Sequence, residues 1–172
     1  HAYFEGGIYT ITVTVGDEDG GVSLALTATA VVTGVGEVDG VLYIIGTDGK
    51  DQVQVSRDGS QMKVQAQLDD GDIDNERFFD RSGVSEIVIV TCEDEDQVQI
   101  AEEIVILAFI DTGSGNDQIQ TGDGDTTVLA GAGDDQIQTG DGNNFVDAGA
   151  GDDQVQMGEG NDIVLGGDGN DK

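Results

Sequence analysis

A nine-residue repeat runs without a gap from Thr112 to the end of the sequence. The units read TGSGNDQIQ, TGDGDTTVL, AGAGDDQIQ, TGDGNNFVD, AGAGDDQVQ and MGEGNDIVL, followed by the partial unit GGDGNDK. Glycine stands at positions 2 and 4 of all seven units, and position 8 is isoleucine or valine in the six complete ones. So short and regular a period predicts a stack of identical units, none of which can bury a core alone.

The residue types within one unit predict its conformation. Glycines at positions 2 and 4 allow a tight turn whose backbone angles are closed to other residues. Positions 7 to 9 are extended, and successive side chains of a strand point to opposite faces. Position 8 therefore enters the core, while positions 7 and 9 face outward. Turn and strand alternate, so two units complete one coil of an all-β solenoid.

Position 6 of the repeat carries the acidic chemistry. It is threonine at Thr126 and asparagine at Asn144, and aspartate in the other five units: Asp117, Asp135, Asp153, Asp162 and Asp171. A glycine turn can aim its carbonyl oxygens inward at a cation, and the aspartate adds a charged oxygen. Hard cations such as calcium prefer oxygen ligands. The repeat therefore predicts several calcium ions per chain, held in the turns.

The overall charge points to the same partner. The chain has 36 Asp plus Glu against 6 Lys plus Arg, a net charge of −30. The charge argues against nucleic acid and anionic membrane surfaces as partners, because both require clustered basic residues. Such a charge is also typical of disorder, and we expect the calcium-free chain to be loose. The regular spacing of the apolar residues and the 28 glycines favours order once calcium is bound.

Residues 112–172 resemble the RTX family of calcium-binding repeats, with its pattern G-G-x-G-x-D-x-U-x. The resemblance implies a right-handed parallel β-roll with calcium held between turns one coil apart. One stack of ligands would consist of Asp117, Asp135, Asp153 and Asp171. The glycines of the same turns are Gly113, Gly115, Gly131, Gly133, Gly149, Gly151, Gly167 and Gly169. The opposite stack would use Thr126, Asn144 and Asp162, and it departs from the family pattern at the first two. A metal-free β-helix with solvated acidic turns is the alternative interpretation.

Residues 34–111 are interpreted as irregular coils of the same solenoid. Asp51 and Asp96 each begin an Asp-Gln-Val-Gln sequence like that of the regular units, which makes both further candidate calcium ligands. The expected strands are Val41–Ile45, Gln52–Ser56, Met62–Gln67, Glu86–Thr91, Gln97–Ile100 and Ile104–Ile110. Residues 68–83 are predicted to form an insertion. Its run of aspartates favours a solvated acidic loop over a further calcium loop, because the closing glutamate of an EF-hand is missing.

Residues 1–33 have a strand–turn–strand pattern of period two. The residues GIYTITVTV and DEDGG resemble the closing strands of a PKD-type Ig-like domain. We therefore expect a small antiparallel Ig-like part, a partial sandwich, ahead of the solenoid. Both ends of the sequence suggest a segment of a longer chain, or subunits that assemble end to end.

The outward positions of the repeat differ between the two faces. Units with odd numbers present glutamine at positions 7 and 9, which predicts two ladders of glutamines able to hydrogen-bond along the solenoid axis. The other face carries Phe145, Ile163 and Leu165 at outward positions. An apolar strip on so polar a chain marks a contact surface. The alternative is a few unremarkable exposed apolar side chains.

No catalytic group stands out. The only histidine is His1, and the only cysteine, Cys92, is interpreted as a small core residue, so no nucleophile–base pair can be proposed. We therefore predict a binding or structural protein and no enzyme. The expected role is a calcium-binding module of a secreted bacterial filament, surface layer or adhesin, located outside the cell or on its surface. The alternatives are an accessory calcium roll of a secreted enzyme and a carbohydrate-binding module. No apolar run is long enough to insert into a membrane.

Overall fold

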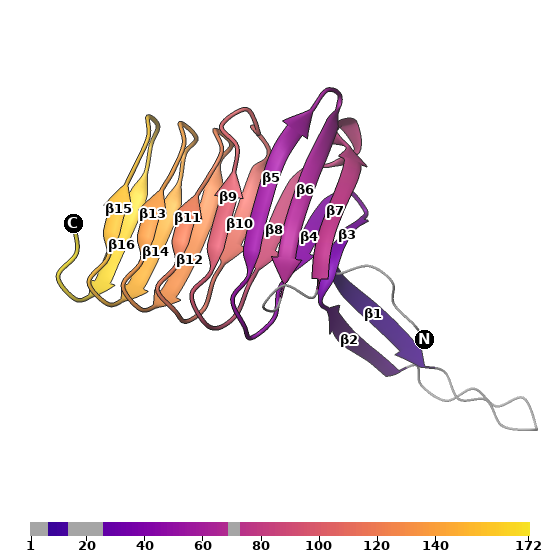
Figure 1. Ribbon diagram of the computed structural model, residues 1–172, viewed down its shortest axis with the longest axis horizontal. Helices are drawn as coiled ribbons and strands as arrows, with labels where there is room; N and C mark the ends of the chain where they lie inside the picture. The colour runs from indigo at the N-terminus through magenta and orange to yellow at the C-terminus, as the bar shows by residue number, and fades with distance from the viewer. Residues whose placement is uncertain (1–6, 14–25, 69–72) are drawn as a thin grey trace, which may run out of the picture.

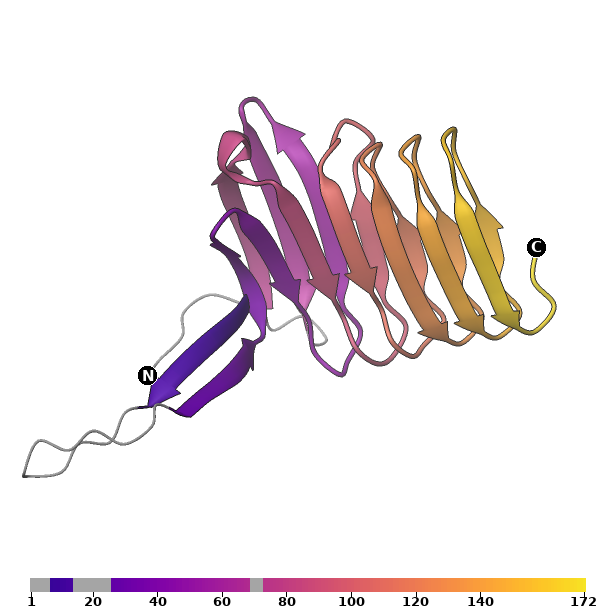
Figure 2. The ribbon, with the colours of Figure 1, turned by 180° about the vertical axis from the view of Figure 1, so that it is seen from behind.

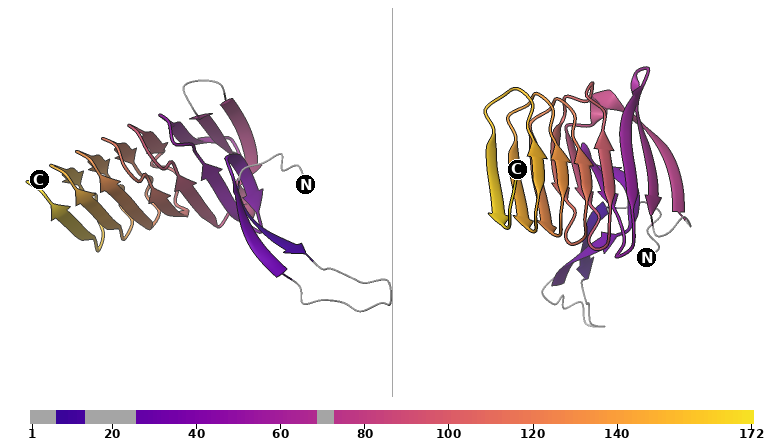
Figure 3. Two further views of the ribbon diagram at one scale, coloured as in Figure 1. Left: turned by 90° about the horizontal axis from the view of Figure 1, so that it is seen from below. Right: turned by 60° about the vertical axis from the view of Figure 1, so that its left-hand side comes forward.

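The computed structural model describes residues 7–13, 26–68 and 73–172, and these form an all-β fold. Two sheets of seven strands each lie face to face, as the layers in Figures 1 and 3 show. One, the first sheet, has the order β16-β14-β12-β10-β8-β4-β3, and the other, the glutamine sheet, has the order β15-β13-β11-β9-β5-β6-β7. The described residues include one short 3₁₀ turn, Arg81–Gly83, and no helix with the length and apolar character needed to cross a bilayer.

The repeat forms the coils that the sequence predicts. Its strands in the first sheet are β12 (Thr126–Ala132), β14 (Phe145–Ala150) and β16 (Ile163–Asp168), and they follow β10 (Leu107–Asp111), the last strand of the irregular coils. Those in the glutamine sheet are β11 (Gln118–Gln120), β13 (Gln136–Gln138) and β15 (Gln154–Gln156). Neighbouring strands pair in parallel with position 8 in register, as in Ile119 with Ile137 and Val128 with Val146.

The irregular coils continue the same two sheets. They contribute β4 (Val41–Ile45) and β8 (Glu86–Val90) to the first sheet, and β5 (Gln52–Asp58) and β9 (Gln97–Ile100) to the glutamine sheet. The pairing is parallel, with Gln52 opposite Gln97 and Gln97 opposite Gln118. The predicted strand Ile104–Ile110 starts only at Leu107, because the preceding residues form a turn in which Ile104 is nevertheless buried.

Three antiparallel strands close the solenoid on the side away from the repeat. β3 (Gly34–Val38) pairs with β4, while β6 (Gln61–Leu68) and β7 (Ile73–Asp80) extend the glutamine sheet beyond β5. The prediction of an acidic loop is therefore wrong for residues 73–80. The open edge of β6 pairs with all of β7, and the Glu76 carboxylate lies 2.9 Å from Lys63 Nζ, which offsets the cost of placing an acid on a strand.

The core between the sheets is unevenly distributed. Its large, fully buried side chains all belong to residues 42–110: Leu42, Ile44, Met62, Leu68, Ile87, Ile89, Ile100, Ile104, Ile110, Val55, Val64 and Val98. The repeat contributes fewer buried apolar residues: Ile119, Val128, Ala130, Ile137, Val146 and Ala148. Because hydrophobic stabilisation scales with buried apolar area, the irregular coils are the better-stabilised part of the solenoid.

Residues 7–13 and 26–32 form a separate small sheet. β1 (Gly7–Val13) and β2 (Leu26–Val32) pair antiparallel from Gly7 opposite Val32 to Val13 opposite Leu26, and this pair projects from the closed end of the solenoid (Figure 2). The antiparallel pairing agrees with the strand–turn–strand pattern. The Ig-like interpretation stays a prediction, and the turn sequence DEDGG lies outside the described residues.

Candidate calcium site

The turns from the first sheet to the glutamine sheet all end in an aspartate, and we call this side of the solenoid the aspartate edge. Its members are Asp51, Asp96, Asp117, Asp135, Asp153 and Asp171. The first five are buried, with at most 3% of the residue exposed, whereas Asp171 is exposed. The structure thus brings together, along one edge, the stack expected in the repeat and the two candidates from the irregular coils.

Hydrogen bonds hold these aspartates in a ladder. Each backbone N–H donates to Oδ1 of the aspartate one coil further on, over 2.9 Å from Asp51 to Asp96 and from Asp96 to Asp117. The distances are 2.8 Å from Asp117 to Asp135, 2.9 Å from Asp135 to Asp153 and 3.2 Å from Asp153 to Asp171. One oxygen of each carboxylate is therefore used by the fold, which positions the other.

That second oxygen has no hydrogen-bond partner in four consecutive coils. The buried, unpartnered atoms are Oδ2 of Asp96, Asp117, Asp135 and Asp153. Within the described part of the chain, none of these four carboxylates forms an ion pair with a lysine or an arginine. A buried charge without a partner costs about 3–5 kcal/mol. A column of such oxygens fits a set of cation ligands far better than a purely structural core.

The pKa values of Asp96, Asp117 and Asp135 reflect the same cost. Burial raises the pKa of Asp135 to about 7, with further contributions from the charges of Asp117 and Asp153. Burial likewise raises the pKa of Asp96 to about 6 and raises that of Asp117, while the nearby hydroxyls of Thr91 and Thr112 lower these two pKa values in part without forming hydrogen bonds of good geometry to Oδ2. A cation bound against the free oxygens would reverse this effect, because an opposite charge favours the ionised form.

The side chains gathered along this edge carry oxygen donors, the type that calcium prefers. Among the described residues, no group of three or more His, Cys, Asp or Glu side chains is placed to hold a metal. Carboxylates alone therefore cannot complete a site, and main-chain carbonyls of the glycine turns would supply the remaining oxygens. Calcium takes 6–8 oxygen ligands and accepts carbonyls readily. Asp51 differs from the others because Thr47 N and Thr47 Oγ1 donate to its carboxylate, at 2.8 and 3.1 Å.

The glycines of the aspartate edge are required by backbone geometry. Gly131 has a φ of +105°, and a Cβ built there would lie 1.9 Å from the carbonyl oxygen of Gly113 in the neighbouring coil. The turn that ends at Asp96 has no glycine at the equivalent positions. Cys92 and Asp94 stand there instead, with φ values of 90° and 69°. The interpretation of Cys92 as a core residue is therefore wrong, because it lies half-buried in this turn.

A second ladder at position 5 was missed by the sequence analysis. Asp134 N donates to Asn116 Oδ1, Asp152 N to Asp134 Oδ1 and Asn170 N to Asp152 Oδ1, over 2.7, 2.8 and 3.0 Å. It runs opposite to the position-6 ladder, so each turn is tied to the coils on both sides. The signal was available, since position 5 is Asn or Asp in all seven units.

The opposite edge carries Thr126, Asn144 and Asp162 at position 6. Thr126 N donates to Asn144 Oδ1 at 3.1 Å, and Asn144 N donates to Asp162 Oδ1 at 2.9 Å, so these residues also stack one coil apart. No unpartnered buried oxygen is found at these three residues. The two edges of the solenoid are therefore chemically different.

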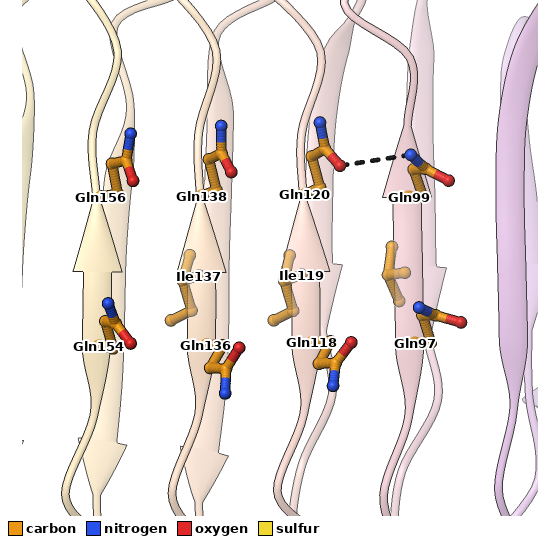
Figure 4. Close-up of a pocket in the computed structure, with 11 residues that line it drawn as sticks. Gln97, Gln99, Gln118, Ile119, Gln120, Gln136, Ile137, Gln138, Gln154 and Gln156 are labelled. Atoms are coloured by element: carbon orange, nitrogen blue, oxygen red, sulfur yellow. Dashed lines mark hydrogen bonds between the residues drawn. The ribbon is translucent and has the colours of Figure 1, made fainter.

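The glutamine sheet presents a shallow groove between two columns of side-chain amides (Figure 4). The groove continues across β5 and β6 past Gln97 and Gln99, and no charged residue lines it. The predicted ladder bonds between glutamines of the regular units are not found among the described residues. Two such bonds form one step earlier: Gln54 Nε2 donates to Gln99 Oε1 at 3.2 Å and Gln99 Nε2 to Gln120 Oε1 at 3.3 Å. The amides of the regular coils beyond Gln120 are left for solvent or a ligand.

A dependence on pH follows from the raised pKa values. Above the folded-state pKa of about 7 for Asp135 the calcium-free fold carries the full cost of a buried charge, whereas the unfolded chain ionises near pH 4 without cost. The stability of the calcium-free chain is therefore expected to rise as the pH falls from 8 to 5. Thermal unfolding in chelator, followed by circular dichroism, measures it. Equal or lower stability at pH 5 would contradict this assignment of the buried carboxylates.

Comparison with known protein families gives one match. The model of the RTX calcium-binding nonapeptide repeat (4 copies) matches residues 109–137, 120–155 and 158–172. This part of the chain thus carries calcium-binding repeats of a kind typical of secreted proteins, and they form the β-roll described above. Comparison with curated proteins and with solved structures gives no match.

Proposed function

We propose that this chain is a calcium-dependent structural module of an extracellular or cell-surface protein, which folds when it meets calcium outside the cell. The observation that carries the proposal is the column of buried, unpartnered Oδ2 atoms on the aspartate edge. Binding free energy at such sites becomes folding free energy, because the site does not exist in the unfolded chain. A single site at 100 times its Kd contributes about 2.7 kcal/mol.

The residues of the chain would divide the work as follows. Asp96, Asp117, Asp135 and Asp153 would each hold a calcium ion with Oδ2 while Oδ1 keeps the coils in register. Glycine-turn carbonyls would complete the ligand set. Lys50, which pairs with Asp94 and Glu95, and Lys172 are the basic side chains described on this edge. Calcium would add the positive charge that its buried carboxylates need, which reduces their mutual repulsion.

A matched pair of substitutions in one turn tests the assignment. Asp135→Asn keeps the Oδ1 acceptor for Asp117 N but removes the buried charge, and it is expected to raise the calcium concentration for half-maximal folding several-fold. Asp134→Asn changes the neighbouring exposed residue to the type already present at Asn116 and Asn170, and it is expected to leave that concentration unchanged. Calcium titration followed by circular dichroism measures both. Equal midpoints for the two variants would exclude Asp135 as a ligand.

The apolar outer face of the first sheet supports assembly with further copies. We call Tyr43, Val88, Phe109, Thr127, Phe145 and Ile163, which stand side by side on successive strands, the apolar strip. Phe145 is half-buried between Thr127 and Ile163, while Ile163 is 59% exposed and its neighbour Leu165 is 48% exposed. Sedimentation of the calcium-loaded protein over a range of concentrations tests the role of this strip. The Phe109→Ser variant is expected to associate more weakly than the unsubstituted chain. A monomer at every concentration in the unsubstituted chain would exclude assembly through the strip.

The groove of the glutamine sheet favours a second candidate function, the binding of a neutral polysaccharide. Side-chain amides both donate and accept hydrogen bonds, as sugar hydroxyls do, and the groove is uncharged on a chain of net charge −30. Affinity electrophoresis through gels with an embedded neutral glucan would detect it. Retardation that is lost in Gln136→Glu would support this function, and equal mobility with and without the glucan would exclude it.

A further inference from the structure

We infer that calcium loads only the aspartate edge of the repeat, and that Thr126 and Asn144 close the opposite edge with hydrogen bonds in place of cations. This inference rests on the proposed calcium-dependent function and deepens it, because it assigns the metal to one side of each coil. It revises the expectation that Asn144 is a calcium ligand.

The side-chain amide of Asn144 occupies the centre of its turn. Asn144 Nδ2 lies 2.8 Å from the carbonyl oxygen of Gly142, 3.1 Å from that of Gly140 and 3.2 Å from Asp162 Oδ1. The residue is only 2% exposed, so these bonds are made away from solvent. A hydrogen-bond donor thus points at the carbonyls that a cation would otherwise need. An amide carries two N–H donors and no net charge, so it can satisfy the two glycine carbonyl oxygens without a metal.

Thr126 also donates a hydrogen bond to a turn carbonyl, in the preceding coil. Its hydroxyl donates to the carbonyl oxygen of Gly124 at 3.1 Å, and the residue is 3% exposed. On the aspartate edge of the repeat, the equivalent side chains of Asp117, Asp135 and Asp153 are carboxylates, which cannot donate when ionised and whose Oδ2 atoms have no partner. One edge therefore offers unsatisfied acceptors, and the other is already closed by donors.

The backbone provides an independent distinction. On the aspartate edge the glycines at positions 2 and 4 of the repeat have positive φ values, as at Gly131 and Gly133, with +105° and +135°. On the opposite edge, none of Gly122, Gly124, Gly140, Gly142 and Gly158 has a positive φ. The exception is Gly160, with φ of +142°, two residues before Asp162. The turn conformation of the aspartate edge thus reappears, in part, only where position 6 is aspartate again.

Counting the bound ions tests the inference. Native mass spectrometry of the calcium-saturated protein is expected to give the same number of ions for the unsubstituted chain and for Asn144→Ala, and fewer for Asp135→Asn. Fewer ions in Asn144→Ala would overturn the inference. If the unsubstituted chain binds no calcium at all, the proposed function itself fails, so the two failures are distinguishable.

Nuclear magnetic resonance tests the same point without a substitution. In the calcium-saturated chain, the side-chain N–H protons of Asn144 are expected to exchange with solvent at least tenfold more slowly than those of Asn143, an exposed neighbour whose amide donates to Asp125 at 3.1 Å. Equally fast exchange at both residues would mean that the Asn144 amide is not buried against the turn carbonyls, and it would overturn the inference.

Discussion

Removing calcium is expected to unfold the repeat while leaving the irregular coils largely intact. Residues 112–172 bury few apolar side chains, and they also bury three carboxylates without a partner, those of Asp117, Asp135 and Asp153. Residues 34–111 contain the large core side chains and the antiparallel strands that cover them. Hydrogen exchange in chelator at pH 8 should therefore show lost protection at Ile119, Val128 and Ile137, and retained protection at Ile44, Ile87 and Ile89.

The same experiment with calcium restored serves as its control, since protection of the repeat must return. Magnesium at equal concentration provides a second control and is not expected to restore the protection of the repeat. It demands a tighter octahedral geometry than calcium and gives up its water reluctantly. Full protection of the repeat in chelator would contradict the calcium-dependent fold, and something other than a cation would then have to stabilise the acidic turns.

Gly131→Ala is expected to abolish the stacking of the coil that contains it, with or without calcium. The substitution places a Cβ 1.9 Å from the Gly113 carbonyl oxygen, and it forces alanine to a φ of +105°. A positive φ alone costs a residue with a Cβ about 1–2 kcal/mol. The contact with the Gly113 carbonyl adds to this cost, because neither of the two coils can move away without breaking its hydrogen bonds to the next coil. Urea unfolding of the calcium-loaded chain measures the loss.

Gly59→Ala is the matched control for that substitution. Gly59 also has a positive φ, +60°, in the turn between β5 and β6, but a Cβ built there meets nothing within 4 Å. Only the conformational cost of about 1–2 kcal/mol is then expected. Similar destabilisation by the two alanines would show that the close approach of the coils at Gly131 is relaxed in solution.

The nine-residue period made the regular coils predictable in detail. Strands at positions 7 to 9, inward residues at position 8 and the stacking of aspartates one coil apart all follow from it, because side-chain alternation and glycine turns are local properties. Asn144 at position 6 also indicated that one edge departs from the repeat pattern. The direction of its side-chain amide could not be predicted, because it depends on where the carbonyl oxygens of the same turn lie after folding.

The irregular part was harder to predict for physical reasons. The acidic composition of residues 69–76 favours a loop, yet β7 begins at Ile73 because β6 presents an unpaired edge and Lys63 is placed beside Glu76. Cys92 and Asp94 adopt positive φ values because the neighbouring coil imposes the turn, although neither residue prefers that conformation. Both cases are decided by long-range pairing, which a local pattern does not encode.

The antiparallel cover formed by β3, β6 and β7 gives the solenoid a starting point. In a linear array each coil is stabilised only by its neighbours, so the first coil to form is the one that lies against a surface already folded. Here that surface is formed by β6 and β7 beside β5, and the coils should fold one after another from this end. Calcium sites would then fill in sequence from Asp96 towards Asp171. The effect of a destabilising substitution would then depend on its position. A substitution near Asp117 should unfold every coil that follows it, whereas the same change near Asp153 should unfold only the last part of the solenoid.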